Sequence, residues 1–312
     1  MTILNPTDQA IQKVASLLSS GGVAAFPTET VYGLGCDTGN EVAIEKVYAL
    51  KKRPLHNPMI AHVLQTSWVR DIAEGWNETC DLLADAFWPG PLTIVLKRKQ
   101  CVPAAACGGH DTIAVRKPNH RVAIALLEAF GKPISAPSAN VSGYISPTSA
   151  VHVEEEFNGK VNVLDGGQCA VGIESTVLSL VGEPTILRPG SVSRDEISTV
   201  IGEVVEVISE QQVDSPGTSQ KHYSPRIPAR QVSERDIADL RNPNAIAIVI
   251  TGKPPITKRI LQMSNCPQKY ATSLYSALRE ADLSGSEEIV IESPPNTNPW
   301  AAVHDRITRC CS

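Results

Sequence analysis

The sequence of 312 residues contains no run of eighteen apolar residues, so it predicts no membrane-spanning helix. Its first residues include Asp8, where a secretion signal would have a cationic start followed by an apolar stretch. This segment has the pattern of a capped amphipathic helix. The eight cysteines show none of the paired spacings of a disulfide framework. We therefore expect free thiols, a cytoplasmic location and no membrane partner.

Several motifs of common enzyme classes are also missing. The sequence has neither a Walker phosphate-binding loop nor the G-x-S-x-G turn of serine hydrolases. The glycines of segment 26–39 approach the dinucleotide-binding fingerprint, but their last spacing is one residue too long. Cys101, Cys107 and His110 match no standard zinc spacing. The sequence therefore predicts no dedicated metal ligands.

The overall charge argues against a protein that coats nucleic acid. The formal net charge is −5, whereas such proteins present a broad basic face. Local basic clusters in an acidic chain fit a small anionic ligand better. The length is that of two domains.

Residues 1–205 alternate short β-rich runs with helical patterns, which predicts an α/β domain. The predicted strands are 23–27, 59–63, 92–97, 112–116, 161–165, 175–181 and 184–188. The predicted helices are 40–51 with Asn40 as its cap, 119–130, 147–157 after a Ser146-Pro147 start, and one that begins at a Ser193–Glu196 capping box. Two pairs of strands follow each other without a helix between them, so we expect a mixed sheet.

Residues 209–229 contain three prolines, a glycine and no apolar periodicity, which is typical of a linker. Beyond it, we predict strands at 245–251 and 288–293 and helices at 268–281 and 299–309. These elements form a second, smaller α/β domain.

Lys51, Lys52 and Arg53 end the predicted helix 40–51, and the prolines that follow turn the chain into strand 59–63. Cations at a helix C-terminus are often only solvated residues that interact with the helix dipole. Cations at the mouth of a sheet, however, are where an α/β protein holds anionic ligands. His62 lies at the end of the strand, where a lone histidine is more often structural.

Two further segments place polar side chains on turns. Thr28, Thr30 and Tyr32 alternate along one stretch, so we expect their hydroxyls to face one side; the simpler interpretation is a tight turn. Ser138 and Asn140 lie in the loop PSANVSG, which could equally be an ordinary polar turn. Together with the cations, these donors suit a nucleotide triphosphate. An ATP-consuming enzyme is the leading hypothesis.

Several motifs in order carry a resemblance that covers nearly the whole chain: FPTETVYGLG, the K-x-R of KKRP, the S-x-N of PSAN, and IEST with LRPG. With them the chain resembles the Sua5 branch of the YrdC/Sua5 family, the L-threonylcarbamoyladenylate synthases. The resemblance implies a YrdC-like catalytic domain at 1–207 with a twisted mixed β-sheet and flanking helices. It also implies a linker or lid at 208–230 and a small, Rossmann-like α/β Sua5 domain at 231–312.

The family makes threonylcarbamoyl-AMP and pyrophosphate from L-threonine, bicarbonate and ATP. The resemblance therefore implies these three substrates and Mg²⁺ bound with ATP. A downstream tRNA threonylcarbamoyl transferase then modifies adenosine 37 of tRNAs that read ANN codons. A weak contact with tRNA is a further partner that the resemblance allows.

The resemblance also assigns roles to residues of this sequence. It implies that Lys51 and Arg53 are catalytic. Four residues match positions that hold L-threonine: Thr30, His62, Arg116 and Ser175. The residues expected around ATP are Arg53, Asn57, Thr112, Ser138, Asn140, Ser146, Arg188, His222 and Tyr223.

One departure concerns the linker, which in the family reads close to SPGMKYxHYAP and here reads SPGTSQKHYSP. Thr218, Ser219 and Gln220 replace the Met-Lys-Tyr run. Because an apolar and an aromatic contact are lost, we expect a looser lid, with His222 and Tyr223 still reaching the nucleotide.

Two alternatives come from other classes. One is a double-stranded RNA-binding module, which the net charge disfavours. The other is an adenylate-forming enzyme of the O-carbamoyltransferase type, which would carry additional large domains.

Overall fold

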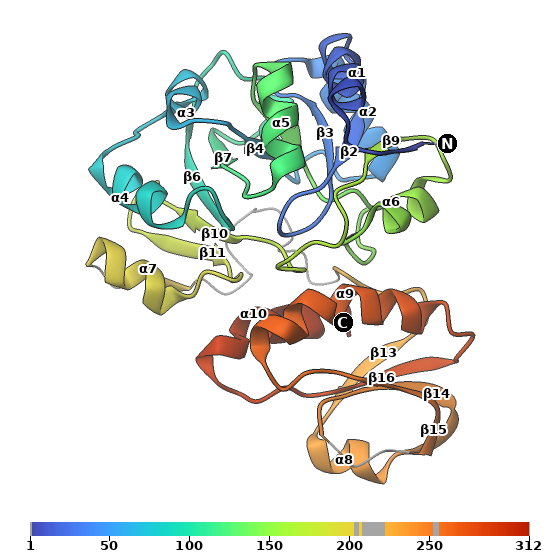
Figure 1. Cartoon of the computed structure of the whole chain (residues 1–312). Coiled ribbons are helices and arrows are strands. Elements are labelled where there is room, and N and C mark those ends of the chain that lie inside the picture. Colours follow the sequence, from blue (N-terminus) through green and yellow to red (C-terminus); the bar gives the residue numbers. More distant parts are fainter. Residues whose placement is uncertain (1, 203–205, 208–221, 252–255, 312) are drawn as a thin grey trace.

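The structure, a computed structural model of the chain, describes residues 2–202, 206–207, 222–251 and 256–311. A larger N-terminal part holds a broad sheet between helices, and a smaller C-terminal part lies beside it (Figure 1). The helices α9 (Pro267–Asp282) and α10 (Ala301–Cys310) lie between the small sheet and the larger part. The predicted two α/β units are therefore confirmed.

Within the described residues, twelve strands form the large sheet. They are β1 (Ile3–Leu4), β2 (Ala24–Phe26), β3 (Gly33–Asp37), β4 (Ile60–His62), β5 (Ala73–Glu74), β6 (Leu92–Arg98), β7 (Thr112–Arg116), β8 (Ile134–Ala136), β9 (Asn162–Leu164), β10 (Thr176–Ser179), β11 (Thr185–Arg188) and β12 (Glu206–Val207). Their order is β1-β9-β2-β3-β8-β4-β7-β6-β10-β11-β12, with β5 beside β6. The two predicted sequential pairs, β6 with β7 and β10 with β11, are antiparallel, while β4 with β7 and β6 with β10 are parallel. The expected mixed sheet is confirmed.

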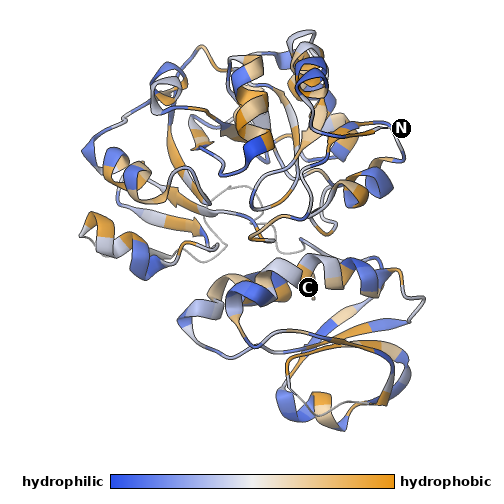
Figure 2. Ribbon diagram, in the orientation of Figure 1, coloured by the Kyte–Doolittle hydropathy of each residue, from blue (hydrophilic) through white to orange (hydrophobic). Residues whose placement is uncertain are grey.

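Helices cover both faces of this sheet, and their apolar sides turn inward (Figure 2). They are α1 (Asp8–Ser19), α2 (Glu41–Lys51), α3 (Thr66–Ile72), α4 (Glu78–Phe87), α5 (Arg121–Phe130), α6 (Ala150–Phe157) and α7 (Arg194–Ile201). Leu18 of α1 and Leu126 of α5 pack in one buried cluster, and Val47 of α2 belongs to another. The predicted cap of α2 and the capping box of α7 are both present. None of the helices in the described part of the chain has the length and apolarity needed to span a bilayer.

The predicted start of α6 is wrong. The helix begins at Ala150 with Ser149 as its N-cap, rather than at Pro147 after Ser146. The intervening backbone is bonded to other segments, because the Pro147 carbonyl accepts from Tyr32 N and the Thr148 carbonyl accepts from Cys169 N. These long-range bonds replace the first turn of the predicted helix.

Residues 27–32 form the turn between the antiparallel strands β2 and β3, so segment 26–39 contains this turn and the whole of β3. Thr28 Oγ1 donates to the Val31 carbonyl at 2.6 Å, so the chain bends instead of running straight. The expectation that three hydroxyls share one side is wrong for Tyr32, whose Oη donates to the Gly167 carbonyl at 2.8 Å.

In the described ranges 222–251 and 256–311, four parallel strands form the C-terminal sheet, in the order β13-β16-β14-β15. Their bounds are β13 (Ala229–Val232), β14 (Arg241–Val249), β15 (Ile256–Gln262) and β16 (Glu288–Glu292). The helix α8 (Glu234–Asp239) packs on one face and α9 and α10 on the other, with a short 3₁₀ turn at Asn298–Trp300 before α10. This arrangement confirms a Rossmann-like α/β domain.

The two parts of the chain are in close contact. A side chain at Gly172, which has a φ of 80°, would place its Cβ 2.5 Å from Cα of Thr272 on α9. Thr272 Oγ1 donates to the Ala170 carbonyl at 2.9 Å, and Tyr144 Oη donates to Asp282 at 2.6 Å. Because only glycine permits so close a backbone approach here, the sequence itself encodes the docking of the second domain.

Candidate active site

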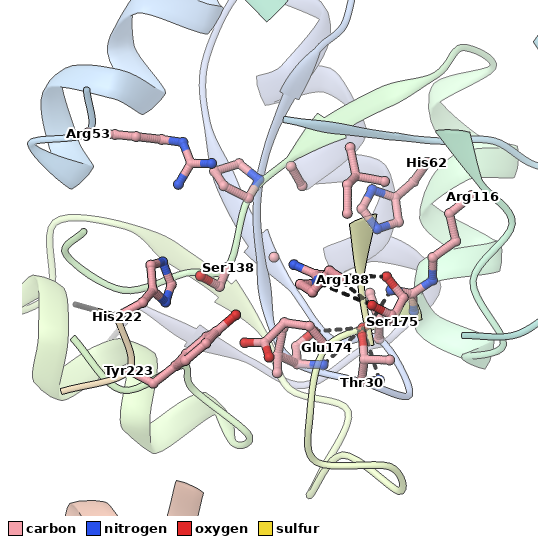
Figure 3. A pocket seen from close by; sticks show the side chains of 16 residues that line it. Thr30, Arg53, His62, Arg116, Ser138, Glu174, Ser175, Arg188, His222 and Tyr223 are labelled. Carbon is pink, nitrogen blue, oxygen red and sulfur yellow. Dashed lines mark hydrogen bonds between the residues drawn. The ribbon is translucent and has the colours of Figure 1, made fainter. Parts of the chain in front are cut away.

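A cavity that is partly open to solvent lies at the ends of β4 and β7, and its empty space, including the open part, is about 530 Å³. The residues that line it are Thr28, Thr30, Val31, Gly33, Arg53, Ile60, His62, Arg116, Ala136, Pro137, Ser138, Glu174, Ser175, Arg188, His222 and Tyr223. In Figure 3, Arg53, Ser138, His222 and Tyr223 lie toward one end, and Thr30, His62, Arg116 and Ser175 toward the other. Arg188 and Glu174 lie between the two groups.

Arg116 is the central cation of the end of the cavity that also contains Thr30, His62 and Ser175. The side chain is only 3% exposed, and its Nη1 donates to Thr30 Oγ1 at 2.9 Å. Its Nη2 lies 2.7 Å from Glu29 Oε2, at ion-pair distance. Arg116 Nε and Glu29 Oε1 are buried and have no hydrogen-bond partner in the part of the chain that the structure describes. This end therefore holds a fixed guanidinium with unused donor capacity.

His62 contributes an acceptor to the same end. Its Nδ1 lies 3.3 Å from the Ile134 carbonyl, which only accepts, so Nδ1 carries the proton. Burial, together with the charge of Arg116, lowers the pKa of His62 to about 3. The imidazole is therefore neutral at physiological pH, and its Nε2 is left as an acceptor.

Ser175 lies where the IEST and LRPG motifs meet. Arg188 Nη2 donates to the Ser175 carbonyl at 2.8 Å and to its Oγ at 3.2 Å, while Thr93 Oγ1 lies 2.8 Å from that Oγ. Gly190 passes so close that a Cβ there would lie 2.2 Å from the Thr176 nitrogen. The glycine of LRPG is therefore required for the two motifs to pack together.

Arg53, in the turn after α2, reaches the end of the cavity that also contains Ser138, His222 and Tyr223. Its Nη2 donates to Asn57 Oδ1 and to the Pro58 carbonyl, both at 2.8 Å, and its Nε donates to the Asn57 carbonyl at 3.1 Å. Burial lowers the pKa of Arg53 to about 10, so the side chain stays charged at neutral pH. Asn57 does not line the cavity and contacts this site through Arg53.

Lys51 is buried beside this end and does not line the cavity. Its Nζ donates to the carbonyls of Ser138 and Asn140, which joins the K-x-R and S-x-N motifs. Burial lowers the pKa of Lys51 well below its ordinary value. Lys52 is exposed and adopts a left-handed conformation at the end of α2, so it takes no part in the cavity.

His222 and Tyr223 enter the cavity from the segment that follows the undescribed residues 208–221. Their ring centroids are 4.0 Å apart, and the next residue, Ser224, donates its N–H to the Gly143 carbonyl at 2.9 Å. Burial, with the charges of Arg53, Lys51 and Arg188, lowers the pKa of His222 to about 3 despite the nearby Glu174. Thr218, Ser219 and Gln220 lie outside the described residues, so the looser lid stays a prediction.

Glu174 lines the cavity and was missed by the sequence analysis. Its Oε1 accepts from Ser146 Oγ at 2.6 Å and its Oε2 accepts from Arg306 Nε at 2.8 Å. Burial alone would raise the pKa of Glu174, but Arg306, Arg188 and these hydrogen bonds lower it to about 2. The only signal in the sequence was its place directly before Ser175 in IEST.

Comparison with known families agrees with this arrangement. A family described as telomere recombination, Sua5/YciO/YrdC, matches residues 16–190, and one described as the threonylcarbamoyl-AMP synthase C-terminal domain matches residues 192–312. The chain belongs to the Sua5/YrdC family.

Relatives in this family match nearly the full length. The chain is 37% identical to a threonylcarbamoyl-AMP synthase of Pyrococcus abyssi, over 96% of this chain and 93% of the relative. A Bacillus subtilis protein of the same name is 35% identical, over 98% and 94%. The crystal structure of P. abyssi Sua5 complexed with L-threonine superposes with a TM-score of 0.92 at 34% identity, covering 100% of this chain and 98% of that one. Escherichia coli YciO covers only 60% of this chain, with a TM-score of 0.53 at 25% identity.

Not every residue that the Sua5/YrdC resemblance assigned lines the cavity. Thr112 begins β7, opposite Lys97 and at the far end of the strand from Arg116. Asn140 donates from Nδ2 to the carbonyls of Val141 and Tyr144, which shapes the loop. Besides Thr112 and Asn140, the assigned residues outside the lining are Lys51, Asn57 and Ser146.

The donor set around the cavity does not fit a protein-bound metal. No group of three or more His, Cys, Asp or Glu side chains that could hold an ion occurs among the described residues. Glu174, the carboxylate of the lining, already accepts bonds from Ser146, Arg306 and Tyr275.

Proposed function

We propose that this chain is an L-threonylcarbamoyladenylate synthase, which forms threonylcarbamoyl-AMP and pyrophosphate from L-threonine, bicarbonate and ATP. The observation that carries the proposal is a single cavity with two chemically different ends. Arg53, Ser138 and Arg188 suit a polyphosphate, and Thr30, His62 and Arg116 suit an amino acid. Both ends open into one space, as a condensation of the two ligands requires.

L-Threonine would occupy the end at Arg116. The guanidinium can bind the threonine carboxylate with two parallel hydrogen bonds. The hydroxyls of Thr30 and Ser175 and the Nε2 acceptor of His62 are then available to the substrate's amine and hydroxyl. The similarity to a Sua5 that was crystallised with L-threonine supports this placement.

ATP would occupy the end at Arg53, with Arg188 between the nucleotide and the amino acid. His222 and Tyr223 would contact the nucleotide from the linker side. Lys51 supports this end by holding the loop that carries Ser138. Mg²⁺ would be bound mainly by the triphosphate, because oxygen ligands of the phosphates suit this ion and the described residues supply no carboxylate cage.

The reaction needs positioning more than a protein nucleophile. The amine of threonine adds to the carbon of bicarbonate, water leaves, and N-carboxythreonine is formed. Its new carboxylate oxygen attacks the α-phosphorus of ATP, and the bond to the departing pyrophosphate breaks. Fixed cations stabilise the charge that develops on the phosphate oxygens, and a common cavity brings the reactants together. The product is then the donor for a tRNA threonylcarbamoyl transferase.

The test is pyrophosphate release from ATP in the presence of bicarbonate, with L-threonine compared with L-serine and L-valine. We expect release with threonine and at least about tenfold less with valine, because a site that pairs a substrate hydroxyl rejects an analogue without one. Equal release with all three amino acids, or none with threonine, would contradict the proposed function.

A further inference from the structure

Arg306, on α10 of the C-terminal domain, reaches the wall of the cavity in the catalytic domain. The side chain is fully buried, and its Nε donates to Glu174 Oε2 at 2.8 Å. Its Nη2 donates to the Pro189 carbonyl at 3.0 Å, and its Nη1 pairs with Asp305. The guanidinium thus bonds to both the IEST and the LRPG segments, more than a hundred residues away in the chain.

Tyr275, on α9, binds the same carboxylate. Its Oη donates to Glu174 Oε2 at 2.8 Å, and its ring stacks on Tyr223 with centroids 5.5 Å apart. Arg306 lies over the ring of Tyr223, with its Cζ 5.2 Å from the centre of that ring. Tyr223 has a φ of 60°, an uncommon backbone conformation for a bulky residue. The C-terminal domain therefore also holds the residue that projects into the cavity from the linker.

The charge of Glu174 explains why the bond to Arg306 matters. The carboxylate lines the cavity between the two groups of ligand-facing side chains (Figure 3). An uncompensated carboxylate there would repel a triphosphate. A buried carboxylate without a partner is also costly in itself.

We propose that Arg306 and Tyr275 are positioning residues of the active site: they hold and neutralise Glu174, so that its carboxylate does not repel the triphosphate. The C-terminal domain then completes the nucleotide end of the cavity. This inference rests on the proposed function, since it takes ATP as the ligand.

The experiment measures the binding of ATP to the full chain by calorimetry, with L-threonine present and bicarbonate excluded. We expect Arg306→Met to weaken ATP binding by about tenfold or more. Tyr275→Phe removes one hydrogen bond and keeps the stacked ring, so we expect a loss of about fivefold. The matched control is Tyr270→Phe, on the same helix and equally buried, because Tyr270 Oη has no hydrogen-bond partner among the described residues.

A second substitution separates the charge of Glu174 from simple packing. In the double variant Glu174→Gln with Arg306→Met, the carboxylate that repels ATP is gone, so ATP should bind at least about threefold more tightly than to Arg306→Met alone. A role in packing alone predicts no such recovery.

The outcomes are distinct. If the wild-type chain binds no ATP, the proposed function fails. If it binds ATP and both Arg306→Met and the double variant bind equally weakly, the inference is overturned. If Arg306→Met does not fold, Tyr275→Phe decides, and an affinity equal to that of Tyr270→Phe overturns the inference.

Discussion

The ammonium of Lys51 and the carbonyl oxygen of Ser138 lie 2.6 Å apart, and the same ammonium also donates to the Asn140 carbonyl. A cation from the end of α2 thus closes the loop PSANVSG. Lys51 and Ser138 come from motifs that lie far apart in the sequence, so this bond is what makes the two motifs one structural unit. The contribution we predict for Lys51 is to fix the Ser138 hydroxyl at the nucleotide end.

Lys51→Met should therefore lower the free energy of unfolding by about 2 kcal/mol, because it leaves two buried carbonyls without a donor. Turnover should fall with it, since Ser138 is no longer held. The matched control is Lys52→Met, whose exposed side chain should leave both quantities unchanged. Urea unfolding measures the first and pyrophosphate release the second. Equal stability of the two variants would show that the carbonyl contacts contribute nothing.

Arg116→Lys should weaken the binding of L-threonine by about tenfold or more. Lysine keeps the charge but loses the two parallel donors that suit a carboxylate. ATP binding should change much less, because Arg116 lies at the other end of the cavity (Figure 3). Calorimetry with each ligand separates the two effects, and Arg70→Lys on the exposed side of α3 serves as the control. A parallel loss for both ligands would contradict the two-ended cavity.

Arg53→Ala should abolish detectable pyrophosphate release. It should also cost about 2 kcal/mol of stability, since the guanidinium donates three hydrogen bonds to the turn that contains Asn57 and Pro58. Asn57→Ala removes one of these acceptors and should raise the KM for ATP while leaving that for threonine unchanged. His56→Ala is the neighbouring control. Normal turnover in Arg53→Ala would mean that this cation only ends a helix.

The elements with local signals could be predicted from the sequence, and those that depend on distant contacts could not. The cap at Asn40 and the capping box at Ser193 involve residues three positions apart, so the sequence shows both partners. The true start of α6 depends on bonds to Tyr32 and Cys169, which no local pattern contains. β3 was not among the predicted strands, because glycine-rich segments have low strand propensity.

The same distinction applies to the site. Thr30, His62, Arg116, Ser138, Ser175 and Arg188, assigned by resemblance, all line the cavity, and their binding roles stay predictions. Glu174 and Arg306 were missed, because their ion pair exists only after two domains have docked. Lys51 was predicted to be catalytic, and Asn57 and Asn140 to bind the nucleotide. Their contacts in the structure are with the protein itself, and these roles stay predictions.

Acid should destabilise the fold through its buried histidines. The pKa values of His62 and His222 are lowered from 6.5 to about 3, so the unfolded chain binds protons that the folded chain does not. Their contribution to stability is complete above pH 6.5 and is lost as the pH falls toward 3. Each of the two histidines should lower the free energy of unfolding by about 1.4 kcal/mol as the pH falls from 7.5 to 5.5.

The loss of stability between pH 7.5 and 5.5, measured by urea unfolding, should therefore be about 1.4 kcal/mol smaller in His62→Gln than in the wild type. Glu174 does not contribute in this window, because its pKa of about 2 confines its effect to pH values below 4.5. The same loss in both proteins would show that His62 is not held neutral.

The most direct test of the two-ended cavity follows the carbon of bicarbonate. The chain is incubated with ATP, L-threonine and ¹³C-labelled bicarbonate, and the nucleotide product is analysed by mass spectrometry. Our account predicts threonylcarbamoyl-AMP that carries the label, formed together with pyrophosphate and absent when threonine is left out. An unlabelled threonyl adenylate, or pyrophosphate release that needs no bicarbonate, would contradict it.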